Sequence, residues 1–299
     1  MWAEARKSLR TVRDLLRFAV SRFNAAGLAF GHGSDNAYDE AAYLILHALH
    51  LPPDRLEPFL DATLTGSEIE RVIELLWRRV EERLPAAYLT HEAWLGDHRF
   101  YVDQRVIVPR SHIADLLHEA LAPWVPEAGR VRRVLDLCTG SGCLAILAAL
   151  AFPHATVDAT DVSDAALEVA RRNVADYHLE DRITLICGDL FEGLPPGRYD
   201  VILSNPPYVT AESMAALPPE YRAEPTLALD GGVDGLALVR RIIERAPDRL
   251  SADGVLVVEI GDNRAALEAA FPSLAFNWPV LPAGGERVFV LNARQFVAG

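Results

Sequence analysis

The stretch Val134-Leu135-Asp136-Leu137-Cys138-Thr139-Gly140-Ser141-Gly142 decides the fold class of this chain. It reads as an apolar strand, then a glycine turn, then the start of a helix. Glycines at 140 and 142 let the backbone turn tightly and approach a ligand without a Cβ in the way. The third glycine of a dinucleotide fingerprint is absent, because Ala145 stands in its place. Taken alone, the turn fits a structural role as well as a ligand site.

Strands and helices alternate through the chain after about residue 111. Apolar runs predict strands at 131–137, 155–160, 183–187, 199–204, 254–260 and 287–292. Helical patterns fall between them at 142–152, 164–175, 235–250 and 265–271. This alternation predicts an α/β, Rossmann-like domain over 111–299, with a mostly parallel sheet covered by helices on both faces.

Residues 1–84 have a different pattern, which predicts a small helical domain. A helix is expected at 37–49, with its N-cap in Ser34–Asn36. Ser67 and Glu70 have the spacing of a capping box, and apolar residues then recur at helical intervals from Ile69 to Leu84. We expect these helices to recognise a partner rather than to perform chemistry.

Residues 85–110 predict a β-hairpin linker between the two domains. Tyr88, Trp94 and Phe100 are strand formers, and Gly96-Asp97 supplies a turn between them. The predicted order along the chain is therefore helical domain, hairpin linker and α/β domain.

Composition limits the classes of function. The chain has 299 residues, 51% hydrophobic and 24% charged, which is typical of a soluble globular protein of about two domains. Its formal net charge of −13 argues against a general affinity for nucleic acid and favours a basic partner. No apolar run is long enough to span a membrane, and we see no signal peptide. Three scattered cysteines and nine histidines without paired ligand spacing predict no metal and a reducing, cytoplasmic setting.

Acidic residues follow the next two predicted strands. Asp161 lies 21 residues after Gly140, where a carboxylate can accept hydrogen bonds from both hydroxyls of a ribose. Asp189 follows the third strand, where it could contact the amino group of an adenine. Strand carboxyl ends are where such sheets bind ligands, so these acids strengthen the ligand interpretation of the glycine turn.

The tetrapeptide Asn205-Pro206-Pro207-Tyr208 ends the fourth strand. Two prolines end strand pairing and stiffen the turn. The Asn205 side-chain oxygen and the Pro206 carbonyl can accept both hydrogens of a planar amino group, and Tyr208 can stack on it. Such acceptors favour the positively charged nitrogen that forms on attack, and the rigid turn supplies orientation.

The glycine turn, the acid one strand later and Asn-Pro-Pro-Tyr resemble an S-adenosylmethionine-dependent amino methyltransferase. Further segments make most of the chain similar to the protein-glutamine N5-methyltransferase family (HemK/PrmC/PrmB). They are Pro85-x-x-Tyr88, Trp94-x-Gly96-x-x-Phe100-x-Val102, Val106-Ile107-Val108-Pro109-Arg110, and the run from Glu224-Pro225 to Gly235-Leu236. The resemblance implies a seven-stranded class I methyltransferase sheet, S-adenosyl-L-methionine as cofactor and methylation of a glutamine side chain at N5.

The family pattern also implies which residues form the site. Cofactor contacts would fall on Cys138, Thr139, Gly140, Ser141, Gly142, Asp161, Leu190 beside Asp189, and Asn205. Asn205, Pro206, Pro207 and Tyr208 would hold the glutamine. Asp136 would either fix the loop or face the charged amine of the ligand. Arg110 and Glu224 are further candidates, for closing the site or ordering the loop at Asp230-Gly231-Gly232.

The residues after Arg110 separate two branches of the family. Ser111-His112-Ile113 looks like the Val-Pro-Arg-Ser-Pro-Ile of the PrmB branch, which methylates protein three of the large ribosomal subunit, although His112 replaces the usual Pro. We therefore expect a basic ribosomal protein as substrate, with peptide chain release factors as the alternative. A nucleic-acid amino methyltransferase shares the tetrapeptide but should bring a basic face. A non-catalytic cofactor-binding module would not need the Asn205 amide.

Overall fold

The described part of the chain, residues 1–282 and 284–296 of the computed structural model, divides into two units. The helical unit contains Met1–Ala93, Val102–Gln104 and Pro218–Ala223. The sheet unit contains Trp94–Tyr101, Arg105–Leu217 and the residues from Glu224 onward. The chain therefore passes between the units three times inside the predicted linker and twice more around residue 220.

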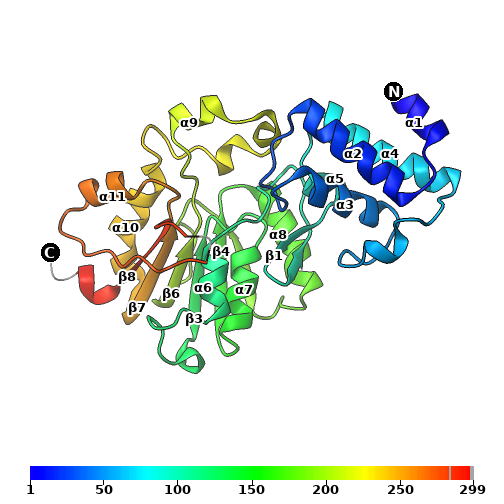
Figure 1. The fold of residues 1–299 in the computed structure, drawn as a ribbon. Coiled ribbons are helices and arrows are strands. Elements are labelled where there is room, and N and C mark those ends of the chain that lie inside the picture. The colour runs from blue at the N-terminus through cyan, green and yellow to red at the C-terminus, as the bar shows by residue number, and fades with distance from the viewer. Residues whose placement is uncertain (283, 297–299) are drawn as a thin grey trace. The chain divides into compact units, whose positions relative to one another are not determined.

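Five α-helices near the N-terminus build most of the helical unit (Figure 1). They are α1 (Trp2–Ser8), α2 (Val12–Ala26), α3 (Ala37–Ala48), α4 (Gly66–Glu81) and α5 (Ala86–Thr90). Their apolar faces enclose one core, in which Leu15, Leu44 and Leu76 are buried. Burial of each such side chain contributes about 1.5–3 kcal/mol. Among the described residues, no helix combines the length and apolar character needed to cross a membrane.

The start of α4 differs from its predicted cap. Ser67 and Glu70 were expected to form the capping box, but the helix begins at Gly66 and Thr65 is its N-cap. The Thr65 hydroxyl accepts from the Glu68 N–H, and the Glu68 carboxylate accepts from the Thr65 N–H. Two Ser/Thr-x-x-Glu pairs overlap in this stretch, and the helix uses the earlier one because Ser67 already lies in its first turn.

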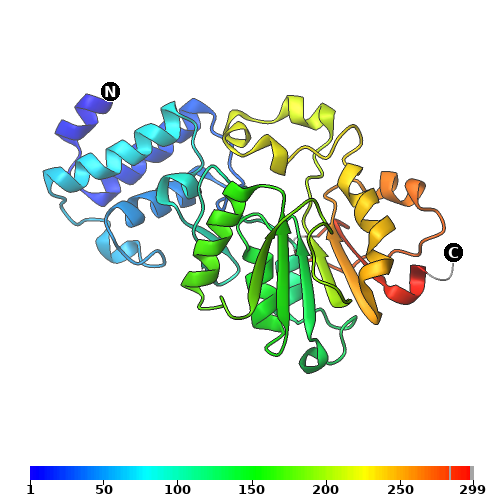
Figure 2. The same ribbon diagram turned by 180° about the vertical axis from the view of Figure 1, so that it is seen from behind.

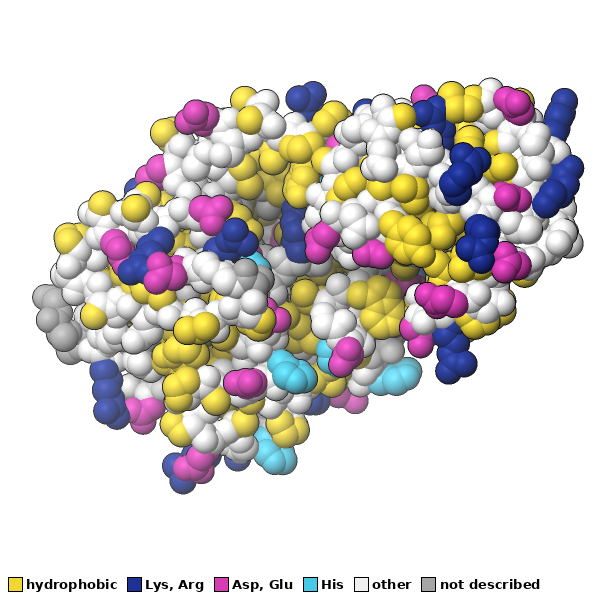
Figure 3. All heavy atoms as spheres, in the orientation of Figure 1, with side chains coloured by type: hydrophobic (Ala, Val, Ile, Leu, Met, Phe, Trp, Pro, Cys, Tyr) yellow, Lys and Arg dark blue, Asp and Glu magenta, His cyan; other side chains and the backbone are white. Residues whose placement is uncertain are grey.

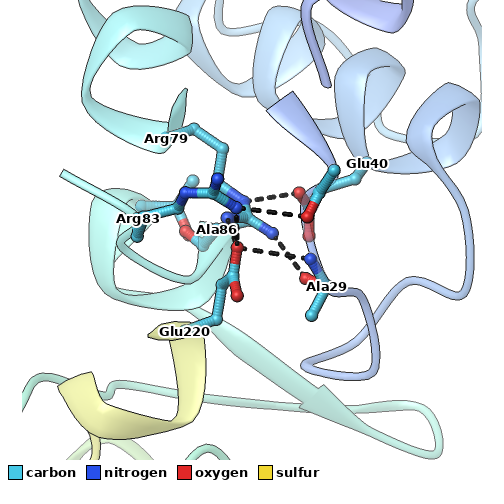
Figure 4. Close-up of polar contacts among 8 residues, drawn as sticks. Ala29, Glu40, Arg79, Arg83, Ala86 and Glu220 are labelled. Carbon is cyan, nitrogen blue, oxygen red and sulfur yellow. Dashed lines mark hydrogen bonds and ion pairs between the residues drawn. The ribbon is translucent and has the colours of Figure 1, made fainter. Parts of the chain in front are cut away.

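A buried ionic network holds the short segment from later in the chain within the helical unit (Figure 4). Arg79 is fully buried, donates to Glu40 at 2.6 Å and lies 3.5 Å from Glu220. Arg83 donates to the same Glu220 oxygen at 3.1 Å, and the Ala29 N–H donates to it at 3.2 Å. The 3-10 helix η3 (Pro219–Ala223) carries Glu220 and is thus held by the fully buried Arg79 and the partly exposed Arg83.

The predicted linker contains a shorter hairpin than expected. Its strands are β1 (Ala93–Leu95) and β2 (His98–Phe100), with Gly96 in the turn at φ +59°. Residues 86–90, where Tyr88 was expected in a strand, form α5 instead. Pro85 precedes the first turn, and Ala86 and Ala87 are strong helix formers, so local helix propensity prevails there.

A six-stranded sheet forms the centre of the sheet unit (Figure 2). The strands are β3 (Arg133–Leu137), β4 (Thr156–Asp161), β5 (Ile183–Cys187), β6 (Tyr199–Ser204), β7 (Leu250–Glu259) and β8 (Val288–Asn292). Their order is β5-β4-β3-β6-β7-β8, with all neighbours parallel except β8, which runs antiparallel to β7. The α/β, Rossmann-like prediction is confirmed, and every strand and helix predicted from residue 131 onward is present.

Helices cover both faces of this sheet. The helices are α6 (Ile113–His118), α7 (Cys143–Ala151), α8 (Asp164–Asp176), α9 (Ala211–Ala216), α10 (Ala237–Arg249) and α11 (Arg264–Ala270). One core packs α6 and α7 against Val134 and Val201, and a second packs α10 and α11 against Leu135 and Ile202. Alternate residues of one strand therefore enter opposite cores, as the pleat requires.

The number of strands departs from the seven implied by the family resemblance. Among the described residues, the place of a further strand beside β8 holds only an isolated antiparallel bridge between Asn277 and Val290. The two residues exchange backbone hydrogen bonds of 3.1 and 2.8 Å. Pro279 lacks an N–H and restricts the residue before it, so pairing does not continue past Trp278.

Candidate active site

A cavity of about 280 Å³ lies where β3, β4, β5 and β6 reach their carboxyl ends. The register aligns Leu137 of β3 with Thr160 of β4 and with Ser204 of β6, so the loops after these strands meet at one edge. Seven of the predicted site residues line the cavity: Cys138, Gly140, Asp161, Asp189, Leu190, Asn205 and Pro207. Residues from four separate loops therefore surround one space.

The glycine turn has the backbone shape that its sequence predicts. Gly140 and Gly142 have φ values of +54° and +79°, in the left-handed region. Cys138 also has a positive φ of +58°, and so does Leu190 at +54°. Left-handed geometry at a non-glycine residue is strained, and such strain is concentrated at ligand sites. Both strained residues line the cavity.

Asp161, the last residue of β4, organises the turn from the neighbouring strand. Its Oδ2 accepts from the Gly140 N–H at 2.9 Å, and its Oδ1 accepts from the Ser163 N–H at 2.9 Å. Burial raises the pKa of this carboxyl above its usual value. Each carboxylate oxygen retains a lone pair, so both can still accept a hydrogen bond from a ligand in the cavity.

Four predicted cofactor residues support the turn from behind instead of lining the cavity. Asp136 is fully buried, and its Oδ2 accepts from the Thr139 hydroxyl at 2.6 Å. Burial raises the pKa of Asp136 to about 7. The Ser141 carbonyl accepts from Asn173, and Gly142 begins α7 where a Cβ would lie 3.1 Å from Ala170. The bond from Thr139 is the contact that a loop-fixing role for Asp136 requires.

Asp189 lines the cavity, but its carboxylate already has a partner. Its Oδ2 accepts from Arg241 of α10 at 2.8 Å, and Arg241 lines the same cavity. Both side chains are roughly half exposed, so solvent screens this pair. At this cavity the Asp189 carboxylate is therefore one half of an ion pair and not a lone acceptor.

The Asn205–Tyr208 turn takes part in two hollows. Asn205 and Pro207 line the cavity already described, whereas Tyr208 lines a second hollow of about 530 Å³. Pro206 is buried between them. The second hollow also contains Arg110, Ser111, His112, Glu259, Gly261 and Asn263. The turn thus contributes residues to both hollows.

Arg110 and Glu224, the further candidates from the sequence, form a close pair. The guanidinium donates both Nη groups to the two carboxylate oxygens of Glu224, each at 2.6 Å. Glu224 also accepts from the Val108 N–H at 2.9 Å, and its side chain is buried. This pair links Val108–Arg110 to the start of the segment that leads to Asp230.

Sequence reasoning missed three residues that contact Tyr208. Glu259 ends β7, and its Oε1 accepts from the Tyr208 hydroxyl at 3.1 Å. Asn263 donates to the Tyr208 carbonyl at 2.8 Å. A Cβ at Gly261 would lie 2.7 Å from the Tyr208 ring. The signal available was an acid at the end of the apolar run Val255–Val258, with Ile260, Gly261 and two polar residues after it.

The described residues contain no group of three or more His, Cys, Asp or Glu side chains that could hold a metal ion. The fold and the site together define an S-adenosylmethionine-dependent methyltransferase of the Rossmann-like class. Residues 112–217 match the family model described as "Methyltransferase small domain". The hMettl16 catalytic domain, solved in complex with the MAT2A 3'UTR hairpin 6, shares this fold with a TM-score of 0.50 and 18% identity, covering 75% of this chain and 80% of that one.

Curated relatives identify the family more specifically than the fold does. A protein of Bordetella pertussis is 64% identical, covering 97% of each chain, and one of Neisseria gonorrhoeae is 57% identical, covering 99% of each. Both are named ribosomal protein uL3 glutamine methyltransferase. The chain belongs to the family of ribosomal protein uL3 glutamine methyltransferases. The resemblance to the PrmB branch is thereby confirmed, even with His112 at the position where that branch more often has Pro.

Proposed function

We propose that this protein transfers a methyl group from S-adenosylmethionine to the side-chain nitrogen of a glutamine in ribosomal protein uL3. The observation that carries the proposal is the Asn205–Tyr208 turn, which contributes to the cavity at the strand ends and to the hollow beside it. Relatives that carry this name match nearly the whole chain, which supports the choice of substrate.

The residues of the cavity fit S-adenosylmethionine. Asp161 offers two carboxylate oxygens to the ribose hydroxyls. Gly140 lines the cavity with no protein atom within 4 Å of the place where its Cβ would be, which leaves room for the ligand. Val162, Leu190 and Leu238 supply apolar walls, as an adenine ring requires.

When bound, the cofactor supplies an electrophilic methyl group on a sulfonium sulfur. The nitrogen of a glutamine amide is a poor nucleophile because its lone pair is delocalised into the carbonyl. The Asn205 side-chain oxygen and the Pro206 carbonyl would accept its two hydrogens and stabilise the positive charge that develops on attack. The two prolines hold these acceptors in fixed directions, so orientation supplies much of the rate. The methylated nitrogen then releases a proton to solvent.

Charge supports a basic protein as the partner. The chain carries 42 acidic and 29 basic residues, and opposite charge speeds the encounter with a basic protein. In the helical unit, Arg6 pairs with Glu70 and Arg13 with Asp61, and basic and acidic side chains are interspersed on the face drawn in Figure 3. That distribution does not favour nucleic acid as the substrate. We propose that the helical unit recognises uL3 and that the reaction takes place in the cytoplasm.

Methyl transfer from labelled S-adenosylmethionine tests the proposal. Purified uL3, class-one release factors and ribosomal RNA would be compared as acceptors, with Asn205→Ala as the inactive variant and Asn277→Ala as an asparagine control away from the site. We expect label in uL3 alone, mapped to a glutamine by mass spectrometry and absent with Asn205→Ala. Label in a release factor instead of uL3 would show that release factors are the substrate. Label only in RNA would overturn the proposal.

A further inference from the structure

We infer that Glu259 and Asn263 are positioning residues that hold Tyr208, and through it the Asn205–Tyr208 turn, in the geometry needed for methyl transfer. The inference rests on the proposed function, because it assigns these residues a part in that reaction. It concerns the last residue of β7 and the loop that follows it, which belong to neither the glycine turn nor the tetrapeptide.

Glu259 fixes the phenol end of Tyr208. The side chain of Glu259 is almost completely buried, and both of its oxygens are engaged. Oε1 accepts from the Tyr208 hydroxyl at 3.1 Å, and Oε2 accepts from the Ser111 hydroxyl at 2.7 Å and the His112 N–H at 2.9 Å. One carboxylate therefore joins the tetrapeptide to the segment that follows Arg110.

The next residues fix the ring edge and the backbone of Tyr208. Gly261 has a φ of +57°, and a Cβ there would lie 2.7 Å from the ring, so only glycine allows this approach. Asn263 donates from Nδ2 to the Tyr208 carbonyl at 2.8 Å. A Cβ at Gly235 would collide with the same carbonyl and with the Asn263 side chain that donates to it. The tyrosine is thus held at its hydroxyl, its ring and its carbonyl.

The bond from Tyr208 gives the acid at the end of β7 a contact with the tetrapeptide, beyond its bonds to Ser111 and His112. Val255 to Val258 of this strand are buried and apolar, and an apolar residue at 259 would extend that core without the cost of burying a carboxylate. Burial raises the pKa of Glu259, and burial together with the Glu259 carboxylate raises the pKa of Tyr208. Tyr208 therefore stays neutral and donates its proton to the bond that orients it. Orientation of this kind matters because small displacements of reacting groups cost up to roughly 100-fold in rate.

The test combines kinetics with a double-mutant cycle. Glu259→Ala, Glu259→Gln, Asn263→Ala and Tyr208→Phe would be compared with Glu268→Ala, whose carboxylate lies on α11 and pairs with the half-exposed Arg264. We expect kcat for uL3 to fall roughly 10- to 100-fold in Glu259→Ala and about 10-fold in Asn263→Ala. Glu259→Gln should recover a large part of the loss, because its amide oxygen can still accept from Tyr208. The affinity for S-adenosylhomocysteine should stay within about twofold of wild type in every variant.

The cycle separates positioning from general damage. In a Tyr208→Phe background, Glu259→Ala should lower kcat by less than it does in wild type, since the Tyr208 bond is already absent and only the bonds from Ser111 and His112 remain to be lost. Equal losses of kcat in both backgrounds, or losses matched by Glu268→Ala, would overturn the inference. A loss of cofactor affinity in step with kcat would also overturn it, because it would show general disruption of the sheet unit.

A spectroscopic readout keeps the inference distinct from the proposed function. With 3-fluorotyrosine incorporated, the ¹⁹F signal of Tyr208 is the one that Tyr208→Phe removes. We expect that signal to shift in Glu259→Gln and Asn263→Ala and to stay unchanged in Glu268→Ala. An unmoved signal would refute the positioning role even if uL3 is methylated. A moved signal without methylation of any glutamine would instead leave the contacts standing and refute the proposed function.

Discussion

Removal of the Glu220 charge should loosen the helical unit far more than removal of a surface charge on the same helices. Glu220 is fully buried, and its Oε1 accepts from Arg83 at 3.1 Å and from the Ala29 N–H at 3.2 Å, with Arg79 at 3.5 Å. Glu220→Gln keeps the shape and an acceptor, but leaves Arg79 with Glu40 as its acidic neighbour. Hydrogen bonds to charged groups contribute about 1.5–3 kcal/mol, and breaking a buried pair costs about 3–5 kcal/mol. Since Glu40 remains, we expect a loss of about 2–4 kcal/mol in the free energy of local unfolding.

Glu82→Gln is the matched control, because Glu82 pairs with Arg78 at 3.1 Å and is 40% exposed. An exposed pair at this helical spacing contributes no more than about 0.5 kcal/mol. Hydrogen exchange followed by mass spectrometry measures α2 and α4 separately from the sheet unit. The expected loss corresponds to exchange in α4 that is roughly 30-fold to several hundred-fold faster in Glu220→Gln.

The effect should also depend on pH. Burial alone would raise the pKa of Glu220, but hydrogen bonds from backbone N–H groups and Arg83 outweigh it and lower the pKa. The stabilising charge is therefore present above the usual glutamate pKa and is lost as pH falls through the lowered value. The difference between wild type and Glu220→Gln should shrink accordingly in acid. Exchange in α4 that rises no more in Glu220→Gln than in Glu82→Gln would refute this reasoning.

Three further predictions follow from the site and the caps. Because burial raises the pKa of Asp161, the affinity for S-adenosylhomocysteine should decline on acidification at a higher pH than the usual pKa of an aspartate would give. Calorimetry should show weak, pH-independent binding in Asp161→Asn. An Asp161→Asn variant with the pH profile of wild type would contradict the assignment of Asp161 to the ribose. Thr65→Ala should destabilise α4 by about 1 kcal/mol, whereas Ser67→Ala should destabilise it by about a few tenths of a kcal/mol, both measured by hydrogen exchange. A larger loss in Ser67→Ala would instead support Ser67 as the N-cap. Gly142→Ala, with φ at +79° and its Cβ 3.1 Å from Ala170, should cost roughly 1–3 kcal/mol of stability in the sheet unit, and a melting temperature equal to wild type would show that the backbone relaxes freely.

Local patterns predicted the elements that depend on neighbouring residues. The run from Val134 to Gly142 predicts strand, turn and helix because apolar periodicity and glycine act over a few residues. Asp161 and Asn205 could be found for the same reason, since each follows a predicted strand and parallel strands bring their carboxyl ends together. The prediction of the α4 cap was wrong, because local spacing does not choose between two overlapping Ser/Thr-x-x-Glu pairs, and the helix uses Thr65.

Long-range partners could not be predicted from such patterns. Glu259 contacts Ser111, 148 positions away, and Tyr208, 51 positions away, and nothing beside it in the sequence indicates either partner. The Arg241 partner of Asp189 likewise lies 52 positions along the chain. The described residues also lack the seventh strand that the resemblance implies. Local patterns could not predict this, because strand length at Asn277 depends on where pairing with β8 stops as well as on local propensity.

The assignment of Pro218–Ala223 to the helical unit has a consequence for how the protein is made. N-terminal domains usually fold as soon as they have left the ribosome. Here the first 93 residues emerge with Arg79 and Arg83 lacking Glu220, which is synthesised well over a hundred residues later. The helical unit therefore reaches its final ion pairing only after most of the sheet unit has been translated. If translation pauses before residue 223, or if the message is truncated there, the helical unit should remain without its Glu220 ion pairs. Chaperones would then bind this incompletely paired intermediate.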